Sequence, residues 1–306
     1  MARETFDAQV QLLVRVLPFV AKEKVFALKG GTAINLFYRD MPRLSVDIDL
    51  TYLPIKDRAE TLTEIDATLE RIGTDLQQSL SGARVRRVDG GGGGDTRILV
   101  TQANVDVKIE TSPVMRGTVN AHELKTVSPS VEERYGFAEM QVVSFADLFG
   151  GKLVAALDRQ HPRDLYDVKL LYDNEGLTDE LFRTFLVYLV SSNRPIHELL
   201  NPGLVNLDAP YRHEFEGMTR DPIPLDELVE TRAQLIADIQ ARLDTRATDF
   251  LLSVHDTTPD FDLIGLPGAA DLPAVKWKLL NLTKLKTGDP EKHAQQRKEI
   301  QRVATS

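Results

Sequence analysis

The chain has 306 residues, 42% of them hydrophobic, so it is long enough to bury one large or two modest cores. It has no cysteine, which excludes disulfides, thiolate metal sites and a cysteine nucleophile, and its net charge of −9 argues against a non-specific nucleic-acid coat. No apolar run reaches the roughly 18 residues needed to span a bilayer. The N-terminal segment also lacks signal-peptide features, so we expect a cytoplasmic protein, by default a monomer.

Up to residue 143 the sequence alternates between helical and extended patterns. Period-2 alternation and short apolar runs predict strands over residues 24–29, 44–53, 83–88, 97–102 and 104–113. Helical spacing predicts helices over residues 8–23, 32–40 and 57–80. The side chains expected to face inward are Val10, Leu13, Val14 and Leu17 in the first of these helices and Leu62, Ile65, Leu69 and Ile72 in the third.

Five consecutive glycines at residues 90–94 lie between two predicted strands. Glycine-rich phosphate loops have fixed spacings and open a helix, whereas this run is homopolymeric. We therefore interpret it as the flexible tip of a hairpin rather than as a phosphate site.

From residue 144 onward the pattern is almost wholly helical, over residues 144–160, 162–174, 178–192, 225–254 and 273–286. The predicted fold class is therefore α+β, with a small mixed sheet and its helices in residues 1–143 and a helical domain in residues 144–306.

The last 33 residues are basic although the whole chain is acidic. Eight Lys and Arg residues stand against three acids, so residues 274–306 carry +5 and the rest of the chain carries −14. The basic residues are Lys276, Lys278, Lys284, Lys286, Lys292, Arg297, Lys298 and Arg302. This tail is either a footprint for a polyanion such as RNA, with Trp277 able to stack on a base, or an ordinary solvated helix face.

The first candidate for chemistry is Gly30-Gly31-Thr32, where a predicted strand meets a predicted helix. Glycines permit close backbone approach, helix-leading N–H groups favour anions, and the threonine hydroxyl adds a donor. The segment suits a phosphate chain. The alternative is a tight turn in which Thr32 only caps the helix.

The second candidate is Asp47-Ile48-Asp49. Residues two apart on a strand point to the same face, so both carboxylates project side by side and repel one another unless a cation lies between them. Mg²⁺ is often held by one or two carboxylates together with substrate phosphates. The alternative is an exposed edge strand whose acids face water.

A third acid is available on the strand over residues 104–113, where Asp106, Lys108 and Glu110 share one face. If this strand neighbours the D-x-D strand, one of these acids could complete a metal clamp or act as a base. We prefer Glu110 to Asp106 for that role.

The fourth candidate joins two helices. Lys152 lies in the first, and Arg163, Asp164 and Asp167 lie in the second, which begins at Pro162. Lys152 could neutralise a triphosphate, and Asp167 could orient that lysine or a nucleophile. A structural ion-pair network between the helices is the alternative.

Taken in order, these four segments resemble the AbiEii/AbiGii toxin family of nucleotidyltransferases, within the DNA polymerase β-like superfamily, and most of all its mycobacterial branch, the MenT toxins. The family's helix-leading G-G or G-S and its D-x-D are matched by Gly30, Gly31, Thr32, Asp47 and Asp49. Its later lysine and R-D-x-x-D are matched by Lys152, Arg163, Asp164 and Asp167, and its K-I-D/E strand by Lys108, Ile109 and Glu110.

The resemblance implies a bilobed, polymerase β-like protein whose helical C-terminal lobe completes the active-site cleft. It implies a toxin that uses a nucleoside triphosphate and Mg²⁺ to add nucleotides to the 3′ end of tRNA, which blocks aminoacylation and translation. Asp47 and Asp49 would hold the metal, and Glu110 and Asp167 would support catalysis. The nucleotide would be bound by Gly30, Gly31, Thr32, Ser45, Lys152, Arg163 and Asp164.

The resemblance also implies a cognate antitoxin as partner. In some relatives the partner phosphorylates a Ser or Thr two residues before the first Asp, and Ser45 occupies that place here. A phosphate there would repel the nucleotide and compete for the metal.

Two rival functions fit the same residues. One is transfer of AMP to a protein or small-molecule hydroxyl, and the other is an inactive module that only binds a nucleotide. The intact set of Asp47, Asp49 and Lys152 argues against inactivity. The six histidines have no metal-ligand spacing, which argues against a zinc enzyme.

Overall fold

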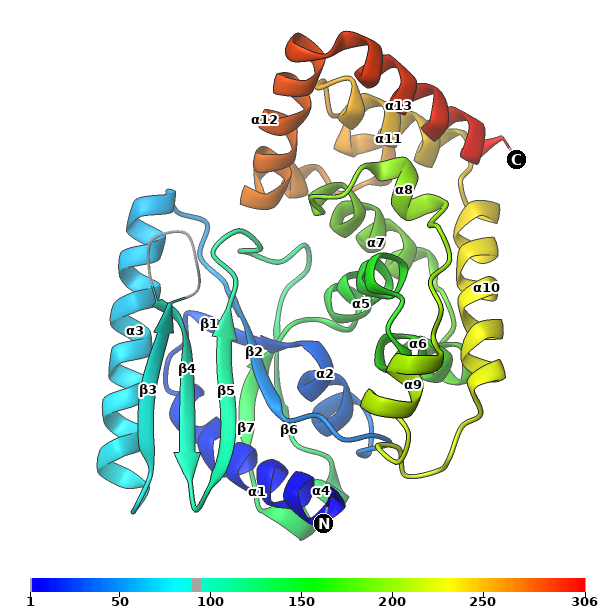
Figure 1. Ribbon diagram of the computed structural model, residues 1–306. Helices are drawn as coiled ribbons and strands as arrows, with labels where there is room; N and C mark the ends of the chain where they lie inside the picture. The colour runs from blue at the N-terminus through cyan, green and yellow to red at the C-terminus, as the bar shows by residue number, and fades with distance from the viewer. Residues whose placement is uncertain (1, 90–94, 306) are drawn as a thin grey trace. The chain divides into compact units, whose positions relative to one another are not determined.

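The computed structural model describes residues 2–89 and 95–305, so the predicted hairpin tip at residues 90–94 lies outside the described residues. The chain divides into two compact units, each with its own packed core. Unit 1 comprises Met1–Ser144 and Gly217–Asp221, and unit 2 comprises Phe145–Glu216 and Pro222–Ser306. Figure 1 shows that the strands lie in the first of these and the later helices in the second.

A seven-stranded mixed sheet is the framework of unit 1, with strand order β3-β4-β5-β2-β1-β7-β6. The strands are β1 (Phe26–Lys29), β2 (Asp47–Tyr52), β3 (Arg84–Asp89), β4 (Asp95–Gln102), β5 (Val105–Thr111), β6 (Glu123–Thr126) and β7 (Glu139–Val142). The pairs β2–β5 and β1–β7 are parallel, and the other pairs are antiparallel. The mixed sheet confirms the predicted α+β class.

Unit 1 also contains helices, which accompany this sheet. They are α1 (Ala2–Val20), α2 (Gly30–Ala33) with the π-helical turn η1 (Ile34–Tyr38), α3 (Arg58–Ser79) and α4 (Pro129–Tyr135). Helices α1 and α3 pack against the strands on the same side, as Figure 1 shows. The four inward residues predicted for α1 are all buried.

The inward face of α3 differs from its prediction. Leu62 is only half-buried, whereas Thr61 and Thr68 are buried. Both threonines have guanidinium partners, because Arg116 donates to the Thr61 hydroxyl and Arg71 donates to that of Thr68 at 2.9 Å. For Thr61 the partner lies 55 residues away in the sequence, so apolar periodicity cannot reveal why a polar side chain is buried there.

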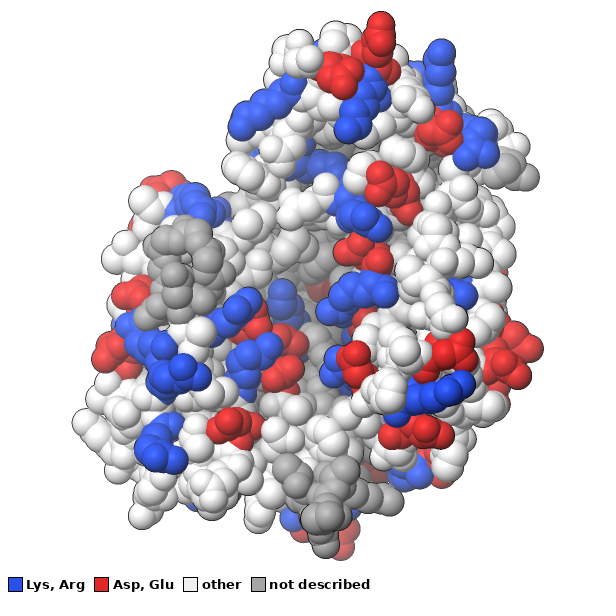
Figure 2. Space-filling view, in the orientation of Figure 1, with Lys and Arg blue, Asp and Glu red and all other residues white. Residues whose placement is uncertain are grey.

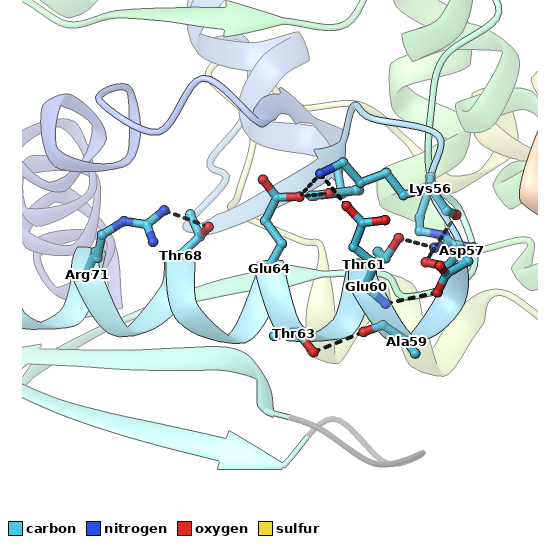
Figure 3. Close-up of polar contacts among 11 residues, drawn as sticks. Lys56, Asp57, Ala59, Glu60, Thr61, Thr63, Glu64, Thr68 and Arg71 are labelled. Carbon is cyan, nitrogen blue, oxygen red and sulfur yellow. Dashed lines mark hydrogen bonds and ion pairs between the residues drawn. The ribbon is translucent and has the colours of Figure 1, made fainter.

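Polar contacts fix the start of α3 directly after β2, as Figure 3 shows. Asp57 accepts a hydrogen bond from the Glu60 backbone N–H at 3.0 Å and so caps the helix. Lys56 forms ion pairs of 2.9 Å with both Glu60 and Glu64. The hydroxyl of Tyr52, at the end of β2, donates to Glu64, so the strand and the first turns of α3 are tied together.

Residues 217–221 return to unit 1 from between two helices of unit 2. The Leu44 N–H donates to the Met218 carbonyl at 2.9 Å, and the Arg220 N–H donates to the Pro42 carbonyl at 2.8 Å. Arg43 and Thr219 form an antiparallel bridge between these bonds. The segment before β2 is therefore held in position by a short stretch that comes much later in the sequence.

Every described element of unit 2 is a helix. The helices are α5 (Phe145–Arg159), α6 (Pro162–Asn174), α7 (Asp179–Ser191), α8 (Ile196–Leu200), α9 (Asp208–Glu214), α10 (Leu225–Ala241), α11 (Thr245–His255), η2 (Phe261–Ile264), η3 (Pro267–Asp271), α12 (Pro273–Gly288) and α13 (Pro290–Ala304). None of the helices in the described ranges is long and apolar enough to cross a membrane.

The predicted helical stretch over residues 225–254 is two helices. Helix α10 ends at Ala241, and α11 begins at Thr245. Asp244 causes a new start, because its side chain accepts a hydrogen bond from the Ala247 N–H at 2.8 Å. Apolar periodicity continues from α10 into α11, so the sequence pattern did not reveal the break between them.

Candidate active site

Strand β1 ends at Lys29, and α2 begins at the next residue, the first glycine of the pair. Gly30 has φ +73, in the left-handed region that glycine enters without steric cost. A Cβ atom at this position would lie 2.5 Å from Oδ2 of Asp49, so the turn needs glycine in order to approach that carboxylate. The helix starts at Gly30 with Lys29 as N-cap, so the alternative in which Thr32 caps the helix is wrong.

The second glycine faces a buried arginine that the sequence analysis did not identify. A Cβ atom on Gly31 would lie 2.8 Å from Nη2 of Arg43 and 2.8 Å from Oγ of Ser45. Only 4% of Arg43 is exposed, and its Nη1 donates to the Leu44 carbonyl at 2.9 Å. In the sequence, only the position of Arg43 two residues before Ser45 could have connected it to the site. Its burial beside a glycine turn is visible only in the tertiary fold.

Thr32 connects the turn to the D-x-D strand. Its side chain is fully buried, and its hydroxyl donates to the backbone carbonyl of Asp47 at 2.5 Å. The same hydroxyl lies 3.1 Å from Oγ of Ser45. In this structure Thr32 therefore fixes the position of the turn relative to the first acid of the strand.

Asp47 and Asp49 lie on β2, which is the central strand of the seven. Ile48 and Leu50 are fully buried on the opposite face, so the two carboxylates share the face that α1 and α3 leave uncovered. The alternative of an exposed edge strand is therefore wrong. The predicted neighbour is confirmed, since β5 pairs with β2 and places Glu110 opposite Asp49.

Burial and charge act together on Asp49. Burial raises the pKa of the Asp49 carboxyl, Lys29 on the neighbouring strand opposes that rise, and the carboxylate of Asp47 adds to it. Burial in turn lowers the pKa of Lys29, while Asp49 and Glu110 oppose that change. Lys29 is thus a counter-ion of Asp49, and the sequence analysis did not single it out.

Glu110 is engaged by two basic side chains. Lys108 lies 2.9 Å from Oε2 of Glu110, and Arg97 on β4 lies 2.7 Å from Oε1. Burial alone would raise the pKa of Glu110, but the hydrogen bonds from Lys108 and Arg97 hold it below its ordinary value. Asp106 lies further along β5, is exposed, and accepts a hydrogen bond from Thr101 at 2.6 Å.

The acids of unit 1 suit a divalent cation whose remaining ligands come from the substrate. The described residues contain no group of three or more acids or histidines placed to hold a metal by themselves. Asp47 and Asp49 are close enough for the charge of one to raise the pKa of the other, and a divalent cation would relieve that repulsion. Two carboxylates with substrate phosphates are a usual ligand set for Mg²⁺.

In unit 2, Lys152 on α5 meets two aspartates of α6. Its Nζ lies 2.8 Å from Oδ1 of Asp164 and 2.9 Å from Oδ2 of Asp167, and all three side chains are at most 8% exposed. Arg159 adds an ion pair of 2.8 Å to Asp164. The ion-pair network between the two helices, which was the structural alternative, is therefore present.

Arg163 does not join this cluster. Its side chain is exposed, and among the described residues no hydrogen bond or ion pair links it to Lys152, Asp164 or Asp167. Gly150, two residues before Lys152, allows close helix packing. A Cβ atom on Gly150 would lie 3.2 Å from the Tyr188 ring on α7, so glycine lets the helices come close.

Most of the basic tail is already used within unit 2. Lys278 is buried and donates to the Ser192 carbonyl at 2.8 Å, and burial lowers its pKa to about 8. Other tail residues form ion pairs, namely Lys276 with Asp271, Arg297 with Asp256 and Arg302 with Glu299. Trp277 is 46% exposed. The tail thus presents fewer available charges than its sequence suggests.

Comparison with known proteins gives one family and one fold. The family model "Nucleotidyl transferase AbiEii toxin, Type IV TA system" matches residues 11–279. The fold is similar to that of MenT4, a nucleotidyltransferase toxin from Mycobacterium tuberculosis H37Rv, with a TM-score of 0.60 and 15% identity over 90% of this chain and 93% of that chain. No curated protein sequence matches the chain significantly.

Proposed function

This chain belongs to the AbiEii family of nucleotidyltransferase toxins of type IV toxin–antitoxin systems, and from this premise we propose that it adds nucleotides to the 3′ end of tRNA. A tRNA extended in this way cannot be aminoacylated, so translation stops. The observation that supports the proposal is the close approach of the Gly30 turn to Asp49, since a backbone suited to phosphate then lies beside an acid suited to a metal ion.

In the proposed reaction the 3′-hydroxyl oxygen forms a bond to the α-phosphorus of the nucleoside triphosphate. The bond from that phosphorus to the oxygen bridging to the β-phosphate breaks, pyrophosphate leaves, and the hydroxyl proton passes to solvent. Such a transfer depends on in-line positioning and on charge neutralisation, and it needs no covalent protein nucleophile.

Residues of unit 1 divide this work. Asp47 and Asp49 would hold Mg²⁺, which when bound neutralises phosphate charge and polarises the α-phosphate. Gly30 and Gly31 give the phosphates access to backbone N–H groups. Arg43, beside Gly31, adds a guanidinium that is suited to phosphate oxygens.

Two further assignments come from the family resemblance. Lys152 would neutralise the triphosphate, and Asp167, 2.9 Å from its ammonium, would orient it. Glu110 would act as a positioning residue, because Lys108 and Arg97 already hold its carboxylate. We propose residues 1–143 as the transferase core and residues 144–306 as the helical region that supplies Lys152 and Asp167.

The reaction can be tested with each α-labelled nucleoside triphosphate, Mg²⁺ and total tRNA. We expect label in RNA, at the 3′ end, with a preference for one or two bases. Label in protein alone would favour transfer of AMP to a protein hydroxyl. If no acceptor were labelled although the nucleotide bound, the chain would be an inactive nucleotide-binding module.

Variants test the residues separately from the acceptor. Asp49→Ala and Lys152→Ala should each lower transfer by about 100-fold or more and relieve growth arrest on expression. Asp75→Ala and Lys169→Ala are matched controls, since both residues form surface ion pairs in the same units and should leave transfer unchanged. Wild-type activity of Asp49→Ala would refute the metal assignment.

We also propose that phosphorylation of Ser45 by a partner antitoxin switches the toxin off. Ser45 Oγ lies beside the Thr32 hydroxyl and the Gly31 turn, so a phosphate there would occupy the place of the nucleotide phosphates. Ser45→Asp should raise KM for the nucleoside triphosphate by about tenfold or more, which corresponds to about 1.4 kcal/mol. Ser45→Ala should stay active, and equal kinetics of the two variants would argue against the switch.

A further inference from the structure

The uncovered face of the sheet carries basic side chains next to the acids. Four of these side chains, which lie on β3, β4 and β5, are together called the basic face: Arg84, Arg86, Arg97 and Lys108. The register places Arg86, Leu99, Lys108 and Asp47 in one row across four neighbouring strands. Figure 2 shows Lys and Arg side chains gathered over these strands.

Two cations of the basic face have no counter-charge among the side chains that the structure describes. Arg84 and Arg86 are exposed, and no hydrogen bond or ion pair joins either side chain to another described residue. Arg87 follows Arg86 on the same strand, but its side chain lies on the opposite face. It forms a 2.8 Å ion pair with Glu70 and another ion pair with Asp66. The arginines of this strand therefore differ by face, since Arg87 is paired with α3 whereas Arg84 and Arg86 are exposed.

The remaining residues of this surface extend it toward the acids. Arg97 and Lys108 both contact Glu110, which stands opposite Asp49. Leu99 is half-buried between Arg86 and Lys108 and gives a ribose or base an apolar contact. Neighbouring strands are about 4.8 Å apart, so β3 lies roughly 14 Å from β2, a distance that a few nucleotides of extended strand would cover.

We propose that the basic face binds the phosphate backbone of the acceptor RNA and leads its 3′ end to Asp47 and Asp49. The inference rests on the proposed function and names the surface that recognises its acceptor. The cations track phosphates, which gives affinity without reading sequence. Charged residues also protect edge strands from pairing with other chains, and the experiment separates that role from RNA binding.

The test measures binding and catalysis independently. A 5′-fluorescein RNA hairpin with a single-stranded 3′ end is titrated with wild type and with Arg84→Gln/Arg86→Gln in increasing salt. The double variant should bind about tenfold more weakly, and its plot of log K against log salt should be shallower by about 1.4, the value for two single-strand phosphate contacts. In transfer assays KM for tRNA should rise about tenfold, while KM for the nucleoside triphosphate and kcat at saturating tRNA stay unchanged.

Two controls accompany this variant. Lys22→Gln/Lys24→Gln removes the same charge from the turn that follows α1 and should leave RNA binding unchanged. Arg84→Lys/Arg86→Lys keeps the charge and should keep the wild-type salt dependence. The inference would be overturned if the Gln double variant bound the hairpin as tightly as wild type, with the same slope of log K against log salt. It would also be overturned if the wild-type protein did not bind the hairpin.

The outcomes for the two proposals differ. If wild type binds the hairpin through the two arginines but labels no RNA, the basic face stands and the tRNA reaction fails. If tRNA is labelled equally well by wild type and the Gln double variant, the reaction stands and the basic face fails. A raised KM for the nucleotide in the double variant would also count against the basic face.

Discussion

At the scale of single residues, Gly30 determines how closely the turn between β1 and α2 approaches the acids of β2. Its φ of +73 and the 2.5 Å from its Cβ position to Asp49 make two separate demands. Gly30→Ala should lower the free energy of unfolding by about 1–2 kcal/mol for the left-handed backbone. It should also displace Asp49 and lower transfer by about 100-fold. Urea unfolding and the labelled-nucleotide assay measure the two effects.

Gly82 provides a matched control for that substitution. It has φ +74, and nothing lies within 4 Å of its Cβ position. Gly82→Ala therefore meets the same backbone cost without disturbing the acids, and it should lose stability while keeping full transfer activity. Equal loss of activity in both variants would mean that Asp49 does not depend on the Gly30 turn.

At the scale of elements, two buried histidines join α11 to α13. The rings of His255 and His293 stack with centroids 4.2 Å apart, and each Nε2 lies 2.9 Å from the carbonyl oxygen of the other residue. A carbonyl can only accept, so both Nε2 atoms carry a proton and donate. Burial lowers the pKa of His255, and the neighbouring His293 ring lowers it further, against the effect of its carbonyl.

The lowered pKa of His255 makes unit 2 sensitive to acid. Below the ordinary histidine pKa of 6.5, His255 binds a proton in the unfolded chain but not in the folded chain. The free energy of unfolding therefore falls as the pH falls from 6.5 toward the pKa of His255 in the folded protein. The loss is up to about 1.4 kcal/mol per pH unit over that window. His255→Gln should unfold in urea with a weaker pH dependence between pH 7.5 and 5, whereas exposed His213→Asn should behave as wild type. An unchanged slope in His255→Gln would refute the assignment.

Many of the elements were predictable, because their patterns are local, but β6, β7, α4 and α13 were not predicted. Alternation of Val107 and Ile109 with Lys108 and Glu110 identified β5 and its outward face. What local patterns could not supply were partners from elsewhere in the chain. Arg116 explains the buried Thr61 of α3, and that contact joins residues far apart in sequence.

At the scale of the whole molecule, the candidate site was predictable as a set of residues but not as an arrangement. The carboxylates, the glycines and Glu110 were identified by spacing, and the register of β2 with β5 brings the acids together. Lys29 and Arg43 were missed because neither the strand register that sets Lys29 opposite Asp49 nor the burial of Arg43 is visible in the sequence. The return of residues 217–221 to the segment before Ser45 has no signature in either stretch of sequence.

That return also sets an order of events while the protein is being synthesised. Pro42 and Leu44 leave the ribosome long before their hydrogen-bond partners Arg220 and Met218, because α5 to α9 are made in between. At about 5–20 residues added per second, the segment with Arg43 and Ser45 waits roughly ten to thirty seconds for this support. A nascent chain therefore cannot complete unit 1 until the ribosome has passed Asp221, which delays a fully formed toxin until most of its message has been read.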